Sequence, residues 1–359
     1  MNFTGNVENY VLESNHYIKN IIENRKKIFK EAVDYFCNNK IEQIYLIGTG
    51  TSLHSHIASK MLMERILKIP VYAEDAMIFN DFTTIFNKNS LVLASSHGGL
   101  STSTINSLKK ATSFGLKTIA STAVHNSEIT KYADKTVYCE IGEENAGPKT
   151  KGYICAIVTN IVFTLEIALK QNKITQEEEN KYFERIIKTA NNIPNIVEAT
   201  KNWYKKHSEE LLKCHRLVVI GYGNNLATYM EGTLKLLESV RYSVTGYELE
   251  QFMHGIYHSI WQNDFMFYIG SQGKYYTRML RMKKYFEERT EHNFIFTSDK
   301  KQDNGKNFIT DFVDDDDFSC LEYIVPLQIL TTYWSKDLGI NCNIPSDPDF
   351  HKKMGSYML

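Results

Sequence analysis

Hydrophobic residues recur at helical spacing between residues 16 and 37, and polar residues fill the opposite face. This pattern predicts an amphipathic helix near the N-terminus. Short β-branched runs then alternate with longer helical patterns, which is typical of parallel strands joined by helices. The predicted strands of this first series are QIYLI at 43–47, PVYA at 70–73, SLVLAS at 90–95, KTIAS at 117–121 and KTVYCE at 135–140.

A charged, helix-favouring segment follows at 174–214 and is interrupted at Pro194. The strand pattern then starts again, with RLVVIG at 216–221, YSVTG at 242–246, FMFYIG at 265–270, NFIFTS at 293–298 and EYIVP at 322–326. The turn IGTG at 47–50 recurs as IGYG at 220–223, each after the first strand of its series. The chain is therefore predicted to contain two copies of one parallel α/β fold.

These patterns divide the chain into five predicted parts. We expect a helical lead-in at 1–40, a first domain at 41–173, a helical connector at 174–214, a second domain at 215–345 and a C-terminal tail at 346–359. The acidic run at 314–317 is predicted to be a solvated loop before the last strand. A metal site there is disfavoured, because adjacent carboxylates cannot all face one ion.

Composition and charge narrow the class of partner. The 41 Lys and Arg residues balance 42 Asp and Glu residues, which gives a net charge of -1 at pH 7. This balance provides no general field for a nucleic-acid backbone, and no long basic run provides a local one. We therefore expect no nucleic-acid partner.

Cysteine usage and apolar segments indicate where the protein works. The six cysteines are widely separated without a C-x-x-C pair, which is typical of free thiols in a reducing compartment. The N-terminus lacks the pattern of a secretory signal. The most apolar stretch, 153–169, carries Asn160 and Glu166, so we expect a core helix rather than a membrane span. We expect a cytoplasmic protein without a membrane partner.

Two turns rich in glycine and hydroxyl residues follow predicted strands. The first is GTGTS at 48–52, and the second is SSHGGLSTST at 95–104. In an open parallel sheet, ligands bind beyond the carboxyl ends of the strands, where helix N-termini offer free N–H groups. Hydroxyls add donors without adding charge, so this pair of turns suits the phosphate of a small substrate. Either turn alone could be a structural N-cap.

Two nucleotide-binding alternatives fit the sequence less well. The segment GTGTSLHSH lacks the third glycine of the dinucleotide fingerprint, and neither half contains the P-loop motif G-x-x-x-x-G-K-[ST]. We therefore expect no cofactor and no metal ion.

The motifs GTGTS, SSHGGLSTST, ENAGPKTKGY, YMEGTLKLLE and MHG together resemble the tandem sugar isomerase (SIS) domain family. This family includes the isomerase part of glucosamine-6-phosphate synthase and the fructosamine-6-phosphate deglycases. The resemblance covers residues 41–359 and implies two flavodoxin-like αβα sandwiches with parallel sheets.

The resemblance also implies a set of substrate-binding residues. The second turn carries one residue more than the family pattern, so that the family's threonine falls on a serine. The positions matched to phosphate or sugar contacts are Thr51, Ser52, Ser95, His97, Gly98, Ser101 and Lys149.

Three further positions match catalytic residues of the family. Glu238 matches its glutamate and His254 its histidine, at the separation found in the synthase, and Lys353 in PDFHKK matches the reactive lysine of the tail. Glu238 is the candidate base for moving a proton between C1 and C2 of the sugar. His254 is the candidate for ring opening, and Lys353, or Lys352 after a one-residue slip, for Schiff-base formation.

Three functions remain open at this point. The first, which the MHG element and the tyrosine-containing tail favour, is a deglycase that cleaves a 6-phosphorylated ketosamine to sugar 6-phosphate and amine. The second is an amino-sugar phosphate isomerase or deaminase. The third is a non-catalytic sugar-phosphate sensor, which Leu237 and Met253 keep open because they replace lysines of the synthase. The same replacements are also consistent with a changed amine group on the substrate. The resemblance also implies a homodimer or a higher homo-oligomer.

Overall fold

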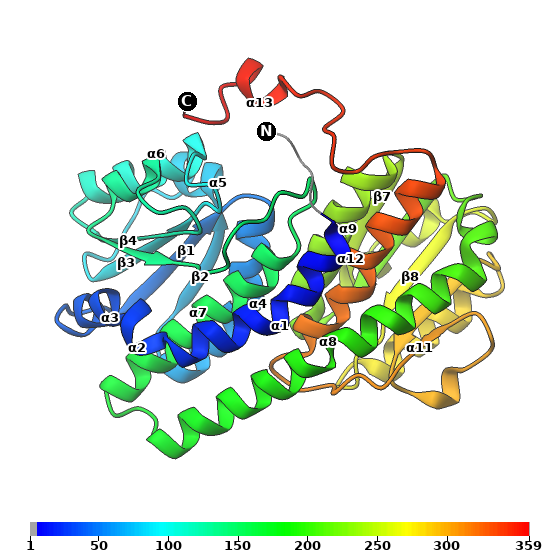
Figure 1. Ribbon diagram of the computed structural model, residues 1–359, viewed down its shortest axis with the longest axis horizontal. Coiled ribbons are helices and arrows are strands. Elements are labelled where there is room, and N and C mark those ends of the chain that lie inside the picture. The colour runs from blue at the N-terminus through cyan, green and yellow to red at the C-terminus, as the bar shows by residue number, and fades with distance from the viewer. Residues whose placement is uncertain (1–5, 359) are drawn as a thin grey trace. The chain divides into compact units, whose positions relative to one another are not determined.

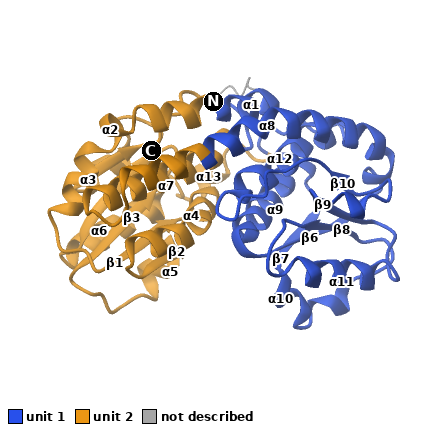
Figure 2. Ribbon diagram, turned by 90° about the horizontal axis from the view of Figure 1, so that it is seen from below, with its two compact units in different colours: residues 1–15, 145–150, 185–345 blue, residues 16–144, 151–184, 346–359 orange. Residues whose placement is uncertain are grey.

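The computed structural model describes residues 6–358 and divides into two compact units (Figure 2). Unit 2 contains residues 16–144, 151–184 and 346–359, and unit 1 contains residues 1–15, 145–150 and 185–345. Helices α1 (Val7–Glu23) and α8 (Gln176–Leu211) contribute residues to both units. The predicted five-part division of the chain remains a prediction.

Unit 2 has a five-stranded parallel sheet in the order β2-β1-β3-β4-β5, of which Figure 1 labels β1 to β4. Its strands are β1 (Gln43–Gly48), β2 (Val71–Asp75), β3 (Ser90–Ser95), β4 (Lys117–Thr122) and β5 (Lys135–Tyr138). Its helices are α2 (Arg25–Ile28), α3 (Lys30–Cys37), α4 (Thr51–Leu67), α5 (Ala76–Asp81), α6 (Thr102–Ser113), α7 (Lys151–Lys170) and α13 (Phe350–Lys353), with a 3₁₀ turn at Glu128–Tyr132. From β1 the chain crosses to β2 on one side of β1, and from β2 it continues to β3 on the other side of β1. The topological switch point therefore lies between β1 and β3.

Unit 1 repeats this topology with the order β10-β9-β8-β6-β7, also parallel. Its strands are β6 (Arg216–Gly221), β7 (Ser243–Glu248), β8 (Phe265–Ile269), β9 (Asn293–Thr297) and β10 (Phe308–Ile309). Its helices are α9 (Leu226–Val240), α10 (Leu249–Met253), α11 (Tyr276–Phe286) and α12 (Ser319–Asp337), with 3₁₀ turns at Gly223–Asn225, Ile256–Ser259 and Lys300–Gln302. The predicted fold class, two parallel α/β sandwiches, is therefore confirmed.

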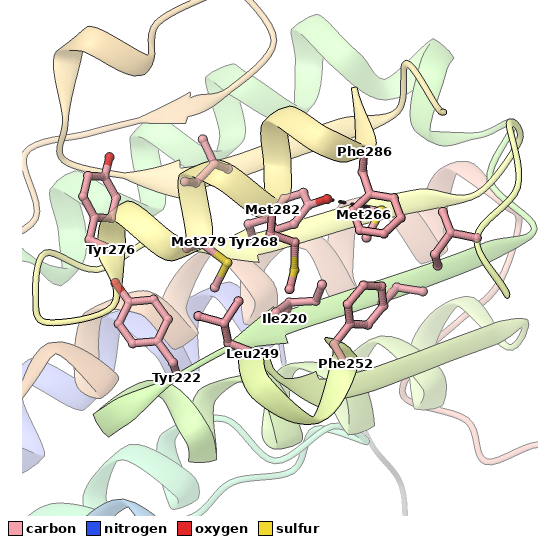
Figure 3. Close-up of a cluster of buried hydrophobic side chains, with 13 residues drawn as sticks. Ile220, Tyr222, Leu249, Phe252, Met266, Tyr268, Tyr276, Met279, Met282 and Phe286 are labelled. Carbon is pink, nitrogen blue, oxygen red and sulfur yellow. Dashed lines mark hydrogen bonds between the residues drawn. The ribbon is translucent and has the colours of Figure 1, made fainter. Parts of the chain in front are cut away.

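The central strands of both sheets are buried almost throughout, as their continuous apolar runs require, whereas the edge strands β2, β5 and β7 are partly exposed. In unit 1, Ile220, Met266 and Tyr268 project from the strands into a cluster with residues of α10 and α11 (Figure 3). The aromatic ring of Phe252 on α10 packs against Phe286 of α11, with 5.5 Å between ring centroids. This cluster fixes α10, and with it the start of the segment that carries His254.

Helix α7 is long and apolar enough to cross a membrane by length and composition alone, but 89% of its most apolar window is buried within the fold. Asn160 of this helix bonds to Ser59 and contacts His56 on α4. The polar groups in this stretch therefore serve helix packing, as expected for a core helix.

The predicted strand at 322–326 is wrong, because these residues lie in the middle of α12. The last strand is β10, only two residues long, and it precedes the acidic run. The prediction of a solvated acidic loop is also wrong in part. Arg185 of α8 donates to Asp315 at 2.7 and 2.8 Å and to Asp317 at 2.8 Å, and Asp317 is buried.

Two helix predictions need smaller corrections. The N-terminal helix begins at Val7 rather than at residue 16, and the chain reaches Cys37 through two further short helices. The connector is one unbroken helix that contains Pro194, so the proline does not interrupt it. A proline removes only one hydrogen bond of the helix ladder, which a helix of 36 residues tolerates.

Candidate active site

The two hydroxyl-rich turns of unit 2 follow β1 and β3, the strands on either side of the switch point. These strands are neighbours, with Ile47 of β1 opposite Ala94 of β3. Both turns therefore lie at the same edge of the sheet. Thr51 and Ser52 form the first turn of α4, directly after Gly50, whose φ of 57° suits glycine.

The second turn is tied down mainly by its own backbone and hydroxyl groups. Ser101 is the N-cap residue of α6, and its N–H donates to the Ser96 hydroxyl at 3.3 Å. The hydroxyl of Ser101 accepts from Thr104 Oγ1 at 2.9 Å and makes no cap hydrogen bond to the helix. Ser101 is thus held at the helix N-terminus with its oxygen on the same side as the hydroxyl of Thr104, where an anion would be stabilised.

The glycine that this turn requires is Gly99 rather than Gly98. Gly99 has a φ of 71°, and a Cβ there would lie 2.0 Å from the Ser127 hydroxyl. Gly98 is exposed, and a Cβ there would meet nothing within 4 Å. Gly98 remains a predicted contact residue, whereas Gly99 sets the shape of the turn.

His97 lies against the N-terminus of α7. A Cβ on Gly152 would lie 2.6 Å from His97 Cε1 and 2.9 Å from the Glu144 carboxylate. Glu144 is buried, and its two oxygens accept from the N–H groups of Lys151 and Gly152 at 3.0 and 2.9 Å. The imidazole therefore sits beside a capping carboxylate. Glu144 was not among the predicted residues, because its partners are seven and eight residues away in sequence.

The residues Lys149, Thr150 and Lys151 of the motif ENAGPKTKGY have different surroundings. Lys149 donates to the Ala146 carbonyl at 3.1 Å, and Gln328 donates to the Thr150 carbonyl at 3.2 Å. Lys151 is fully buried and donates to the Glu143 carbonyl at 2.9 Å. Its ammonium also lies 4.4 Å from the centre of the Tyr17 ring. Lys151 is thus a structural residue, while Lys149 remains half-buried.

Glu238 lies on α9 in a line of three charged side chains within unit 1. The Lys235 ammonium is 2.9 Å from Glu238 Oε2 and 3.6 Å from Glu231 Oε1. Glu231 and Lys235 are 0% and 2% exposed, whereas Glu238 is 39% exposed. The Glu238 carboxylate therefore reaches solvent, while the buried Lys235 ammonium pairs with it and with the buried Glu231. Glu231 was not predicted as a site residue, although its spacing of four residues from Lys235 could have identified it.

The C-terminal part of unit 1 passes close to Glu238. Burial raises the pKa of the Cys342 thiol, and the nearby Glu238 carboxylate acts in the same direction. Gly147 donates to the Asn343 side chain at 2.9 Å, and a Cβ on Gly147 would lie 2.3 Å from the Cys342 carbonyl. The loop that carries Lys149 therefore packs on the segment beside Glu238, so unit 1 brings these two predicted residues into one region. The neutral thiol is not a nucleophile there.

His254 follows α10 and is exposed to solvent, with 71% of its side chain accessible. Its Nε2 lies 3.4 Å from Glu250 Oε1, so its partner in the structure is Glu250 rather than Glu238. Glu248 caps α10 by accepting from the N–H groups of Glu250 and Gln251, and Phe252 anchors the helix in the cluster of Figure 3. The segment is thus fixed at its start, while the imidazole projects outward.

Lys353 belongs to unit 2, where it lies on α13 and pairs with Asp347 at 3.1 Å. Its side chain is 56% exposed. The tail after α13 binds back to the second turn: Met358 donates to the Leu100 carbonyl at 2.9 Å, and Tyr357 forms an antiparallel bridge with Ser101. Sequence reasoning did not predict this contact.

The structure thus groups the predicted residues into two sets. Unit 2 holds the turns with Thr51, Ser52, Ser95, His97, Gly98 and Ser101, together with Lys353 of the tail, and unit 1 holds Lys149, Glu238 and His254. No cluster of three His, Cys, Asp or Glu side chains within residues 6–358 has the arrangement of a metal site.

Comparison with known proteins finds a family model for part of the chain and similar proteins for most of it. Residues 39–168 match the SIS domain model. A glutamine–fructose-6-phosphate aminotransferase (isomerizing) of Clostridium acetobutylicum is 28% identical over 253 residues, which are 70% of this chain and 41% of that protein. The chain spans about half the length of the curated relatives it matches.

Two solved structures have the same fold over nearly the whole chain. A candidate phosphosugar isomerase from Clostridium difficile 630 is 29% identical, with a TM-score of 0.93 over 99% of each chain. The C-terminal domain of glucosamine-fructose-6-phosphate aminotransferase from Francisella tularensis is 20% identical, with a TM-score of 0.82 over 96% of this chain and 99% of that one. Residues 39–168 therefore match the SIS domain family, and the chain as a whole has the fold of these two solved structures.

Proposed function

We propose that the protein is a phosphosugar-processing enzyme of the isomerase type, and that its substrate is a 6-phosphorylated ketosamine, which it cleaves to sugar 6-phosphate and amine. The observation that carries the proposal is the line Glu231–Lys235–Glu238, a solvent-reaching carboxylate held by a buried ammonium. Proton transfer between C1 and C2 needs one carboxylate base that is held in place and still reaches the substrate. The two hydroxyl-rich turns support the phosphate-binding part of the proposal.

The phosphate end of the substrate binds at the turns of unit 2. Hydroxyls of Thr51, Ser52, Ser95 and Ser101 donate to the phosphate oxygens, and the N-termini of α4 and α6 add favourable dipoles. These donors are neutral, so the site selects among anionic ligands by their geometry more than by their net charge. His97 and Gly98 complete the second turn, and Lys149 contacts sugar hydroxyls.

Ring opening precedes the proton transfer. His254 moves a proton between the anomeric hydroxyl and the ring oxygen, which releases the open-chain ketone. The amine of Lys353 adds to C2 of the open-chain ketone and a water molecule leaves, forming a Schiff base; addition of water to this Schiff base then releases the lysine and restores the C2 carbonyl before C1 is deprotonated. Before it attacks, Lys353 must give up both its pairing with Asp347 and its proton.

Glu238 then carries the central step. Its carboxylate takes a proton from C1 of the open-chain ketosamine, and the electron pair moves toward C2, where the ammonium of Lys235 stabilises the developing negative oxygen. The Glu238 carboxyl exchanges its proton with solvent and then protonates C2, which produces an iminium at C1. Water adds to that carbon, and the amine leaves as the C–N bond breaks, which yields the sugar 6-phosphate.

Incubation with fructoselysine 6-phosphate tests the reaction directly. The proposal predicts equal amounts of free lysine and glucose 6-phosphate from the unmodified protein and a loss of about a thousandfold in Glu238→Gln. Glu177→Gln is the matched control, because that carboxylate is 79% exposed. Conversion of fructose 6-phosphate or glucosamine 6-phosphate without ketosamine cleavage would instead favour the isomerase or deaminase function.

A sugar-phosphate sensor is the second candidate, and the position of Met253 favours it. Met253 packs against the buried cluster of unit 1 instead of offering the charged amine found in the synthase pattern. Tight binding of sugar phosphates without turnover of any ketosamine or amino-sugar phosphate would support this function.

The assembly and the cellular site are also proposals. We propose a homodimer or higher homo-oligomer that works in the cytoplasm. The family resemblance supports the first, and the six cysteines, all free thiols in the structure, support a reducing compartment. Sedimentation of the active protein as a monomer would contradict the proposed assembly.

A further inference from the structure

The tail of the chain adds a short antiparallel segment to the phosphate turn of unit 2. Three hydrogen bonds hold it: Met358 N–H donates to Leu100 O at 2.9 Å, Thr102 N–H donates to Ser356 O at 3.1 Å, and the Thr102 hydroxyl donates to Gly355 O at 3.0 Å. We call Gly355–Met358 the docking segment. Thr102 is the first residue of α6, so the docking segment occupies an N–H group that has no partner within the helix.

The docking segment is continuous with α13 through a compact turn. The His351 ring stacks on the Tyr357 ring with 4.3 Å between centroids, and His351 Nδ1 lies 2.8 Å from the Ser356 hydroxyl. Ser356 N–H also donates to the His351 carbonyl at 3.1 Å. Met358 packs against the buried apolar cluster beneath α5 and α6. Fixing the docking segment therefore fixes α13 as well.

Lys353 is the last residue of α13 and lies just before the docking segment. It is two residues before Gly355, a length of chain that spans at most about 7 Å. Asp347 holds its ammonium at 3.1 Å, and the same carboxylate accepts from Asp349 N–H at 2.9 Å. The lysine is thus kept near the phosphate turn by the backbone of the tail, although its side chain is 56% exposed.

We propose that the docking segment is a positioning element that holds Lys353 for Schiff-base formation by pairing with the backbone of the phosphate turn. This inference rests on the proposed function, in which Lys353 is the attacking amine. Leu100, which provides one of the three acceptors, lies in the part of the turn that carries one residue more than the family pattern. The added residue therefore has a role in docking the tail.

The geometry allows docking to be removed without breaking α6. Proline is well tolerated at the first position of a helix, where its missing N–H has no helical partner. The preceding residue, Ser101, already has the extended conformation that proline requires of its neighbour, with φ of -61° and ψ of 113°. Thr102→Pro removes two of the three docking hydrogen bonds, and Thr102→Ser is the matched control that keeps both.

A second variant acts from the tail side. Met358→Pro removes the bond to Leu100, and Met358→Leu keeps both the N–H and the apolar packing. Amide hydrogen exchange of the tail reports docking, and mass spectrometry after reduction with cyanoborohydride in fructose 6-phosphate reports the Schiff base at Lys353. Sugar-phosphate binding is measured separately by calorimetry.

We expect exchange of the tail amides to rise about tenfold in each proline variant and about a hundredfold in the double variant. Trapping at Lys353 falls about tenfold or more in the double variant, while the Kd for fructose 6-phosphate changes less than about threefold. Both control variants behave like the unmodified protein. A general loss of structure would weaken both the binding of fructose 6-phosphate and trapping at Lys353, so it would not reduce trapping alone.

Two outcomes overturn the inference, and they differ from failure of the proposed function. Unprotected tail amides in the unmodified protein, or full trapping at Lys353 in the double variant, would show that docking does not position the lysine. A protected tail with no trapping at Lys353 in the unmodified protein would instead refute the proposed role of Lys353, and with it the purpose assigned to the docking segment.

Discussion

Glu322 gives unit 1 a dependence of stability on pH that a single substitution should remove. This carboxyl group is fully buried on α12; burial raises its pKa to about 7, and the charge of Asp314 acts in the same direction. Asn192 donates to Oε1 at 2.7 Å, and Val313 N–H donates to both oxygens, at 3.1 and 2.9 Å. These hydrogen bonds lower the pKa, but they do not offset the cost of burying the charge.

The sign and size of the effect follow from this raised pKa. The folded state binds the proton more tightly than the unfolded state, whose pKa is near 4.5, so the stabilisation is complete below pH 4.5 and is lost as pH rises toward 7. The difference corresponds to at most ~3 kcal/mol. Glu322→Gln removes the titration and loses one acceptor, at a cost of about 1 kcal/mol. At pH 8.5 the variant should therefore be more stable by about 2 kcal/mol.

Urea denaturation at pH 5, 7 and 8.5 measures this effect. All three tryptophans, Trp203, Trp261 and Trp334, lie in unit 1, so their fluorescence reports the unit that contains Glu322. Glu177→Gln on the exposed start of α8 is the control and should follow the unmodified protein at every pH. If the free energies of unfolding of Glu322→Gln and the unmodified protein changed equally with pH, Glu322 would not be the source of the pH dependence.

Three further substitutions test other parts of the structure. Ser101→Ala should weaken binding of sugar 6-phosphates about tenfold by calorimetry and leave binding of the unphosphorylated sugar unchanged; equal losses for both would contradict a phosphate contact. Arg185→Met should destabilise unit 1 by about 2 kcal/mol in urea, because it leaves Asp315 and Asp317 without their counter-ion; an unchanged free energy of unfolding would contradict a stabilising role for this ion pair. Gly232→Ala should cost about 1–2 kcal/mol, because a Cβ there lies 2.1 Å from Leu327 Cδ1; adding Leu327→Ala should reverse the penalty of the added methyl, and strict additivity would contradict a direct clash.

The strands β1 to β9 were predictable because each is a short β-branched or aromatic run followed by a turn, and the central strands are buried on both faces. The segment 322–326 has the same composition but lies inside a buried helix. An apolar run that is buried on all sides has no period that separates strand from helix. Strand β10 has two residues, too few to form a recognisable pattern.

The site was predictable where motif and spacing act locally. The turns after β1 and β3 and the i, i+3 pair of Lys235 and Glu238 could be located in the sequence. The docking segment could not, because the Thr102 hydroxyl and Gly355 are 253 residues apart and meet through backbone groups that every residue has. The clamp between Arg185 and the acidic run likewise joins residues 130 and 132 positions apart.

The most direct test of the account is the fate of the C1 proton. The unmodified protein is incubated with fructoselysine 6-phosphate in D₂O, and the glucose 6-phosphate formed is analysed by NMR. Deuterium should appear at C2 with the unmodified protein, because the Glu238 carboxyl exchanges its proton with solvent before it protonates C2. In Glu238→Gln we predict a rate about a thousandfold lower, with sugar-phosphate affinity unchanged. Product formation by Glu238→Gln at the rate of the unmodified protein would contradict the assignment of Glu238 as the base.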